Sequence, residues 1–294
     1  MNARALAGFV ALALALCGCA SGPRVRVEYA PGELQLSRER LQRWVDESVA
    51  IVSETCGRFP VPLLELTIQP RGRERGIRDG TTRSLSDRAE IEVGVGGRAG
   101  ERALERDWVL VHEMLHLSIP NLPPMQHWFE EGLATYLEPL ARARGGKCSE
   151  TEVWRERTAR YAQGLPRPGE GGLDDTRTWA RTYYGGALFC LVADVRIARA
   201  SGGAKSLREA LAGAVARGRS ILESSELSRF ARELDAAIGV EVVAPLYAEW
   251  AHAPVEVDLE GLWRELGVVR DGDSLRFDES APLAAWRASL VRMR

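Results

Sequence analysis

Two histidines and a glutamate within five residues carry the strongest chemical signal in this sequence. His112, Glu113 and His116 form an H-E-x-x-H pattern inside the apolar run Trp108–Leu117. Residues four positions apart lie on the same face of a helix, so the two imidazoles are placed to hold one metal ion together. Glu113 lies one residue round the turn, within reach of a metal-activated water but outside the two-nitrogen clamp. The pattern predicts two zinc ligands and the general base of a peptide-bond hydrolysis.

The residues around this motif favour a buried helix. Leu110, Met114 and Leu117 recur at positions i, i+4 and i+7, and Glu113 is the only Asp, Glu, Lys or Arg from Trp108 to Leu117. A helix that is apolar nearly all round packs inside the protein, where it gives a metal site a rigid, dry support. The alternative is a core helix whose two histidines merely bond to backbone carbonyls.

A second motif supplies the third ligand that a catalytic zinc ion needs. A proline-rich break at 119–124 ends the first helix and lets the chain reverse before a second helix over 127–138. The gluzincin metallopeptidases, the group of thermolysin and the alanyl-type aminopeptidases, carry W-x-x-E-G-x-A here, and residues 128–134 (WFEEGLA) resemble it. This resemblance implies that Glu131 is the third zinc ligand. The alternative is an acidic patch that the helix dipole favours at a helix start.

Two tyrosines further along are candidates for stabilising an oxyanion. The aminopeptidase branch of the gluzincins has a Y-x-x-G motif that points a tyrosine hydroxyl at the tetrahedral intermediate, and residues 182–189 (TYYGGALF) resemble it. The resemblance places that role on Tyr183. Gly185 stands where the family usually has lysine, which leaves the choice between Tyr183 and Tyr184 open. Both rings could instead pack against the core.

Two further residues could support the ligands. Thr135 follows Glu131 by four positions, where thermolysin carries an aspartate that orients a zinc histidine, and His127 opens the second helix. For His127, an ordinary helix-start role is an equal alternative. The chain from about Ala89 onward resembles the glycyl aminopeptidase family most, yet it has no G-x-M-E-N-like segment before the zinc helix. The resemblance therefore favours a peptidase of this clan over aminopeptidase activity in particular.

The first residues are predicted to be a targeting segment. Arg4 precedes an apolar run over residues 5–16 that is too short for a stable membrane span. The following Leu16-Cys17-Gly18-Cys19 resembles the bacterial lipobox, which implies acylation of Cys19 and attachment to a membrane by lipid. No aspartate follows Cys19, which in lipoproteins goes with sorting to the outer membrane, facing the periplasm. Ordinary signal cleavage without lipid is the alternative.

Charge and cysteine content restrict the partners and the redox chemistry. Without residues 1–18, which contain one arginine, the 39 basic residues become 38 against 41 acidic ones, a balance near −3 that argues against nucleic-acid binding. An exported protein can form disulfides, and Cys56 and Cys148, both at loop edges, are the expected pair. Cys190, in an apolar stretch, is expected to be a buried thiol.

The elements that must position the site can be predicted from periodicity. Leu64, Leu66 and Ile68 alternate with polar residues, as do Ile91, Val93 and Val95, and both patterns indicate half-buried strands. The second strand is expected to edge the active-site cleft and to bind a peptide by strand addition, as in gluzincins. A helix is expected to end at Gly57. The intervening segment with Arg71, Arg73, Arg75, Arg78 and Arg83 is expected to be a solvated basic loop.

Together these patterns predict an α+β protein with a thermolysin-like zincin core, a small mixed sheet plus active-site helices, followed by a C-terminal helical region. The expected divisions are a lipoprotein signal peptide (1–18), a tether (19–35) that runs into a first strand, a catalytic domain (36–200) and a helical region (201–294). The predicted function is a lipid-anchored peptidase of the bacterial envelope that hydrolyses peptides with one Zn²⁺ and a zinc-activated water. The alternative is a catalytically silent lipoprotein of the same fold that acts by binding or assembly.

Overall fold

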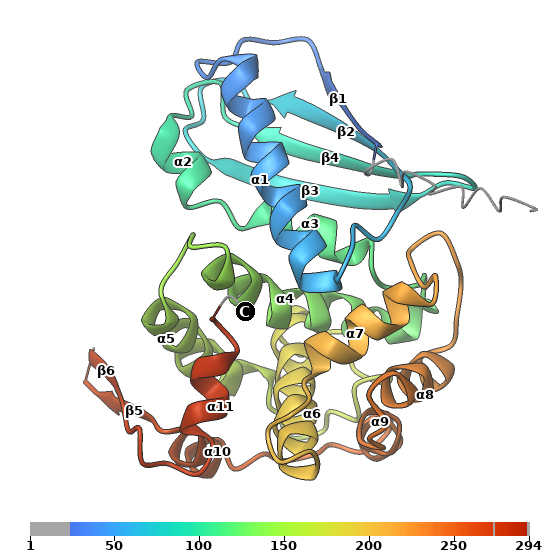
Figure 1. Ribbon diagram of the computed structural model, residues 1–294, viewed down its shortest axis with the longest axis vertical. Coiled ribbons are helices and arrows are strands. Elements are labelled where there is room, and N and C mark those ends of the chain that lie inside the picture. Colours follow the sequence, from blue (N-terminus) through green and yellow to red (C-terminus); the bar gives the residue numbers. More distant parts are fainter. Residues whose placement is uncertain (1–23, 273, 293–294) are drawn as a thin grey trace, which may run out of the picture.

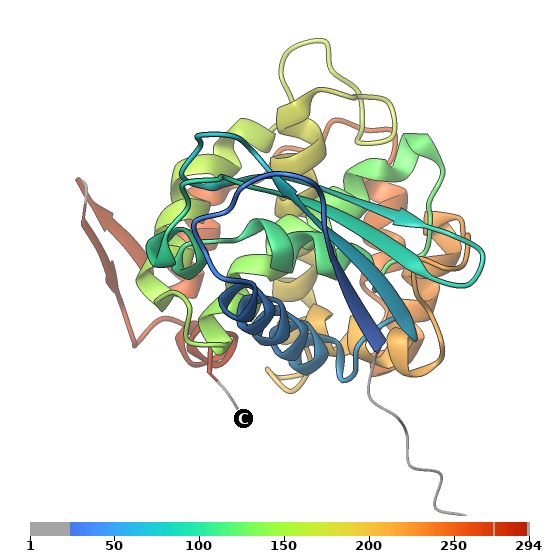
Figure 2. The same ribbon diagram turned by 90° about the horizontal axis from the view of Figure 1, so that it is seen from above.

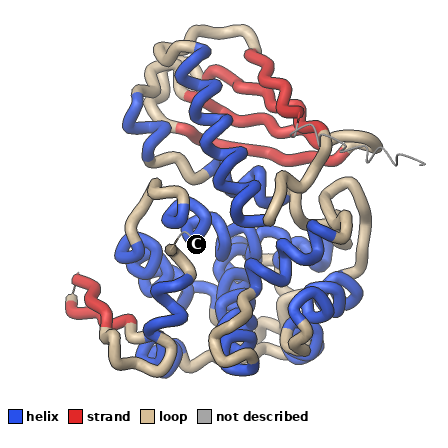
Figure 3. Tube along the Cα trace, viewed as in Figure 1, coloured by secondary structure: helices blue, strands red, loops and turns tan. Residues whose placement is uncertain are grey.

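A four-stranded sheet forms one part of the molecule and a set of helices forms the other (Figures 1 and 3). The structure, a computed structural model, describes residues 24–272 and 274–292. The sheet order is β1-β2-β4-β3, in which β3 runs antiparallel to β4 and the other neighbours are parallel. The strands are β1 (Arg24–Tyr29), β2 (Leu63–Pro70), β3 (Ile77–Ser84) and β4 (Ala89–Val95).

The predicted strands β2 and β4 are confirmed, and they form the centre of the sheet. Leu64, Leu66 and Ile68 of β2 are fully buried, while the residues between them are partly exposed. Residues 24–29, expected as a first strand within the tether, pair with β2 along their whole length. Helix α1 (Arg38–Cys56) lies along one face of the sheet and ends at Gly57, whose φ of 75° is left-handed (Figures 1 and 2).

Two sequence predictions about the sheet are wrong. The arginine-rich segment is not entirely a loop, because Arg78 and Arg83 belong to strand β3. The strand at the edge next to the active-site helices is therefore β3, and the strand expected there, β4, is enclosed between β2 and β3. A polar sequence suits β3, since one side of an edge strand remains open to solvent.

The active-site helices lie directly below β3 in Figure 1. Helix α3 (Val109–His116) begins two residues after Asp107, whose carboxylate accepts hydrogen bonds from the amides of Val109 (2.9 Å) and Leu110 (3.3 Å). The indole of Trp44 in α1 donates to the same carboxylate at 3.1 Å, which fixes α3 against α1. Prolines at 120, 123 and 124 then separate α3 from α4 (His127–Arg144), as predicted.

Apart from α2, which lies beside the sheet, the remaining helices form the lower part of the molecule together with α4 (Figure 1). A short π-helical turn, Arg181–Gly185, leads into α6 and carries the two candidate tyrosines. A small hairpin of two antiparallel strands, β5 and β6, projects from the helical part (Figure 3). The elements are α2 (Glu101–Glu105), α5 (Glu150–Arg160), α6 (Gly186–Ala200), α7 (Leu207–Ala216), α8 (Leu227–Ile238), α9 (Val243–Trp250), α10 (Leu259–Leu266), β5 (Val268–Asp271), β6 (Ser274–Phe277) and α11 (Ala284–Ser289).

The predicted disulfide is not formed. Cys56, Cys148 and Cys190 are all free thiols, and the Cys148 sulfur instead lies 3.6 Å from the carbonyl oxygen of Pro139. Cys56 is fully buried at the end of α1 beside Ser118, so its thiol packs in the core. Cys190 is buried, as expected.

The predicted signal peptide and the acylated Cys19 lie outside the described residues. Within the described part, no helix is both long and apolar enough to cross a membrane.

Candidate metal centre and its surroundings

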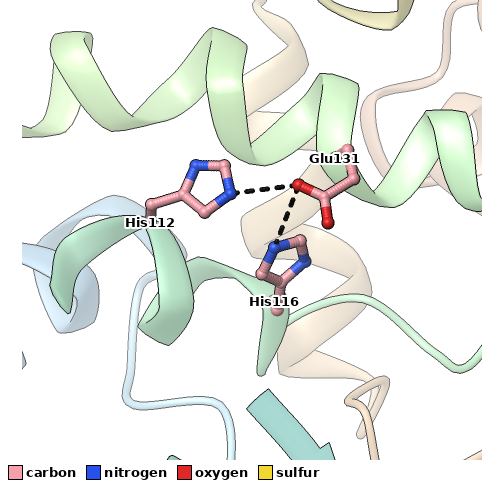
Figure 4. A group of neighbouring side chains, drawn as sticks. All are labelled: His112, His116 and Glu131. Carbon is pink, nitrogen blue, oxygen red and sulfur yellow. Dashed lines mark hydrogen bonds and ion pairs between the residues drawn. The ribbon is translucent and has the colours of Figure 1, made fainter. Parts of the chain in front are cut away.

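Three side chains from two helices converge on one point (Figure 4). His112 and His116 project from successive turns of α3, and Glu131 projects from α4 toward them. The Glu131 Oε2 atom lies 3.2 Å from His112 Nε2 and 3.6 Å from His116 Nε2. One ligand atom from each of the three residues lies within 4.8 Å of the others. The sequence prediction that these residues come together agrees with this geometry.

The spacing fits a tetrahedral zinc ion. Two ligands bound at about 2.0–2.1 Å and separated by a tetrahedral angle lie about 3.3–3.4 Å apart. The two separations between Glu131 and the imidazoles, 3.2 and 3.6 Å, bracket this value. Two imidazole nitrogens and one carboxylate also form the donor set of catalytic zinc sites that keep a fourth position for water or substrate. We conclude that the residues present fit a zinc ion.

The electrostatics of the cluster point to a cation as well. Burial on its own would raise the pKa of Glu131, but hydrogen bonds to His112, His116 and His127 hold that pKa well below its usual range. Burial lowers the pKa of His116, yet the hydrogen bond and charge of Glu131 outweigh this and the net shift is upward. The buried carboxylate thus needs a positive partner, which a metal ion would supply.

Glu113 points to the edge strand and is held there. Thr82 of β3 lies with its Oγ1 2.6 Å from Glu113 Oε2 and 3.0 Å from the Glu113 carbonyl oxygen. Gly80 allows this approach, because a Cβ at that position would lie 2.4 Å from Glu113 Cγ. The general-base candidate is therefore fixed between its own helix and β3, close to both zinc-site histidines.

The two tyrosines of the π-helical turn have different surroundings. Tyr183 lines the same cavity as His112, Glu113, His116 and Glu131. Burial, together with the charge of Glu131 and a hydrogen bond to it, raises the pKa of Tyr183 to about 12, so its hydroxyl remains a donor at neutral pH. Tyr184 instead accepts a hydrogen bond from Arg160 at 2.9 Å. The geometry therefore favours Tyr183 for the oxyanion role.

The other candidates lie around the ligands. His127 Nε2 lies 3.3 Å from Glu131 Oε1, and its Nδ1 lies 2.7 Å from Glu130 Oε2. These two hydrogen bonds raise the pKa of His127 to about 10, so it is cationic beside the carboxylate. Thr135 lies in the lining of a second cavity that His112 also lines.

A buried network fixes the start of α4. The indole of Trp128 donates to Asp174 Oδ1 at 2.7 Å, and the hydroxyl of Tyr247 in α9 donates to Asp174 Oδ2 at the same distance. Gly132 completes the anchoring, because a Cβ there would lie 2.4 Å from the Cα of Gly186 in α6. The tryptophan and glycine of the W-x-x-E-G segment thus hold α4 in place on either side of Glu131.

The residues that sequence reasoning missed lie on segments distant from both motifs. Thr82 and Gly80 are in the segment that was expected to be a loop, and Asp174 lies in the irregular stretch before the π-helical turn. No local pattern identifies them, since their importance comes only from tertiary contacts.

The cavity that contains these groups has a volume of about 420 Å³. It lies between the edge strand and the two ligand-bearing helices, and residues 78–82 of β3 form one wall. Tyr183 and the general-base candidate Glu113 lie on the same cavity as the three possible metal ligands, so one bound ligand can contact all of these groups together.

Solved structures of zinc peptidases share this fold. An aminopeptidase N family protein from Idiomarina loihiensis superposes with a TM-score of 0.60 at 12% identity, covering 84% of this chain and 48% of its own. An M1 zinc metallopeptidase from Deinococcus radiodurans matches with a TM-score of 0.51 at 17% identity, covering 80% of this chain and 49% of its own. The chain is thus similar in fold to M1 zinc peptidases, and it spans about half their length.

No protein-family profile matches the chain, and no curated protein matches it in sequence. The similarity therefore establishes the fold that the chain shares with these structures, and the activity follows only from the site itself.

Proposed function

We propose that this protein is a zinc-dependent metallopeptidase that hydrolyses peptide bonds. The observation that carries the proposal is the convergence of His112, His116 and Glu131, with separations of 3.2 and 3.6 Å, on a cavity that also holds Glu113 and Tyr183. The fold that it shares with M1 zinc metallopeptidases supports the same reading.

Zinc bound by these three ligands would polarise the scissile carbonyl and lower the pKa of a water molecule. Glu113 accepts the proton of the attacking water and passes it to the leaving amine. Thr82 and Gly80 keep the Glu113 carboxylate on the β3 side of the cavity. The hydroxyl of Tyr183 donates to the oxygen on which negative charge develops, while His127 holds the far oxygen of Glu131.

Replacing the base tests the proposal. Glu113→Gln preserves the shape of the side chain and leaves the three zinc ligands in place. We expect it to lower the cleavage rate of a mixed peptide library by at least about 10²-fold. Bound zinc should remain at one ion per chain, measured by elemental analysis. Zinc binding without any cleavage that depends on Glu113 would favour a silent protein that acts by binding or assembly.

The same library separates two modes of cleavage. Peptides with free and with acetylated N-termini are compared at equal concentration. An aminopeptidase requires the free amine, whereas an endopeptidase cleaves both. The absence of a G-x-M-E-N-like segment in the sequence favours cleavage of both forms.

We also propose that a lipid on Cys19 holds the catalytic unit at a bacterial envelope membrane. The support is the Leu16-Cys17-Gly18-Cys19 pattern, since the described structure begins later in the chain. Mass spectrometry of the N-terminal peptide from membrane fractions tests this. An unmodified Cys19 in the mature protein would contradict it.

A further inference from the structure

A second cavity lies beside the metal centre. Its volume is about 400 Å³, and Trp108, His112 and Tyr183 line both this cavity and the one that contains the metal ligands. A ligand held at the metal can therefore extend one of its groups into the second cavity. Nothing in the proposed catalytic steps uses this space.

Exposed aromatic rings line part of this cavity. The side chains of Trp108 and Trp179 are 50% and 60% exposed, which is unusual for residues of this size. The Trp179 ring stacks on Tyr183, with centroids 5.1 Å apart, and meets Tyr184 edge-on at 5.2 Å. These rings offer apolar surface for the hydrocarbon part of a ligand.

Several hydrogen-bond donors in the lining of this cavity have no partner among the described residues. Arg157 is 1% exposed and gives Nη2 to the carbonyl of Tyr136 at 2.8 Å. Its Nε and Nη1, the Nε of Arg142 and the hydroxyl of Tyr161 are buried and have no hydrogen-bond partner among the described residues. Each of these groups can donate a hydrogen bond, so an acceptor on a bound ligand would find donors that the protein leaves without a partner.

The acidic residues of the lining do not pair with Arg157. Glu138 pairs with Arg142 at 3.1 Å and Glu156 lies 3.5 Å from Arg160, which leaves Arg157 without a carboxylate of its own in the lining. Burial also raises the pKa of Glu138 to about 8 against the opposing charge of Arg142, so this carboxyl is mostly protonated at neutral pH.

Another acid, Asp194, lies near Arg157 but its oxygens are committed elsewhere. They accept from the hydroxyl of Tyr136 and the amide of Leu207, both at 2.6 Å. The three arginines of the lining thus outnumber its ionised acids.

We propose that the second cavity is a substrate subsite for a carboxylate, either an acidic side chain next to the scissile bond or the C-terminal carboxylate of a short peptide. An arginine-lined pocket suits a carboxylate because guanidinium groups donate paired, charge-assisted hydrogen bonds. This inference rests on the proposed function, since it takes the ligand to be a peptide held at the metal.

Binding to the zinc-loaded Glu113→Gln protein tests the subsite without turnover. Two pairs of fluorescent peptides are compared by anisotropy: one pair exchanges Glu for Gln beside the central peptide bond, and the other exchanges a C-terminal acid for an amide. We expect the acid of at least one pair to bind tenfold or more tightly than its neutral partner. The pair that shows the preference identifies the source of the carboxylate.

A variant pair assigns the preference to this cavity. Adding Arg142→Gln should reduce the preference to less than threefold. Adding Arg196→Gln, which removes an exposed arginine that pairs with Glu249 on α9, should leave it unchanged. If Arg142→Gln fails to fold, as judged by circular dichroism, the comparison of the peptide pairs on the parent protein still tests whether a carboxylate is preferred.

Equal binding within each pair would overturn the inference, because the cavity would then show no preference for a carboxylate. A preference that survives Arg142→Gln would have to be lost in Arg157→Gln or Arg160→Gln, the other two arginines of the lining. A preference that survives all three changes in folded proteins would place the carboxylate elsewhere and would also overturn the inference. Failure of the proposed function has a different signature. In that case the wild-type protein cleaves no peptide, whatever the binding preference of the Glu113→Gln form.

Discussion

At the scale of single residues, two adjacent tyrosines have different roles. Tyr183 faces Glu131, whereas Tyr184 is bonded to Arg160. Tyr183→Phe removes the donor that faces the developing charge, so we expect kcat to fall about 10²–10³-fold with zinc content unchanged. Tyr184→Phe should change kcat less than about threefold. Equal losses in the two variants, measured by steady-state kinetics, would contradict this assignment.

Thr82 is expected to position the base. Its hydroxyl lies 2.6 Å from Glu113 Oε2. Thr82→Val keeps the shape but removes the hydrogen bond, and it should lower kcat on the order of tenfold with little change in KM, because a misplaced base lowers the rate of the chemical step. Thr82→Ser should restore most of the rate. If the Thr82→Ser and Thr82→Val variants have the same kcat, the hydroxyl of Thr82 has no positioning role.

The three candidate metal ligands could be predicted from sequence, the histidines from their spacing and Glu131 from the resemblance to a gluzincin motif. His112 and His116 need only one helix, and Glu131 lies in a contiguous motif. Thr82 could not be predicted, because its contact with Glu113 spans 31 positions and depends on where β3 pairs in the sheet. The choice between Tyr183 and Tyr184 also required the orientation of the π-helical turn.

At the scale of elements, the close packing of α4 on α6 positions Glu131. A Cβ on Gly132 would meet the Cα and carbonyl carbon of Gly186 at 2.4 Å, where backbone cannot move aside. Gly132→Ala should therefore lower the free energy of unfolding by about 2 kcal/mol or more, and weaken zinc binding. Gly76→Ala, with nothing within 4 Å, is the matched control. Denaturant melts that coincide for the two variants would exclude this packing role.

The start of α3 should make stability depend on pH. Burial raises the pKa of Asp107 from 3.8 to about 6, against hydrogen bonds from Val109, Leu110 and Trp44. The folded-state pKa exceeds the unfolded one, so the stabilisation is complete below about pH 4 and is lost as pH rises to about 6. An asparagine at position 107 keeps a side-chain oxygen that can accept a hydrogen bond from the start of the helix, but it does not titrate.

We therefore expect the stability of the wild-type protein relative to Asp107→Asn to fall by up to about 3 kcal/mol between pH 4 and pH 6. Urea melts of both proteins across this range measure the difference, and other titrating groups cancel because both proteins contain them. Parallel pH profiles would show that Asp107 does not titrate in this way.

Elements with strong periodicity were predictable and the edge strand was not. Strands β2 and β4 alternate apolar and polar residues because one face of each is buried. Strand β3 reads IRDGTTRS, a polar sequence with a glycine inside, because its exposure is high and Gly80 must pass close to Glu113. Identification of β3 as the edge needed the pairing of the strands, which sequence periodicity does not provide.

At the scale of the whole molecule, the cavity is lined by residues of both the sheet and the helical part. These two parts lie one above the other in Figure 1. The sheet contributes the wall that holds the base, and the helices contribute the three ligands and the tyrosine. An α+β class with a C-terminal helical region was predictable from composition and periodicity. The absence of the expected disulfide could not be predicted, because the distance between Cys56 and Cys148 depends on where α1 ends relative to the loop after α4.

The most direct test of this account locates the metal itself. Crystals of the zinc-loaded protein, measured on both sides of the zinc absorption edge, should show one anomalous peak about 2.0–2.2 Å from His112 Nε2, His116 Nε2 and a Glu131 oxygen. The peak should persist in Glu113→Gln and disappear in Glu131→Gln. No peak at this position in the wild-type protein, or a peak that excludes Glu131, would contradict the central claim.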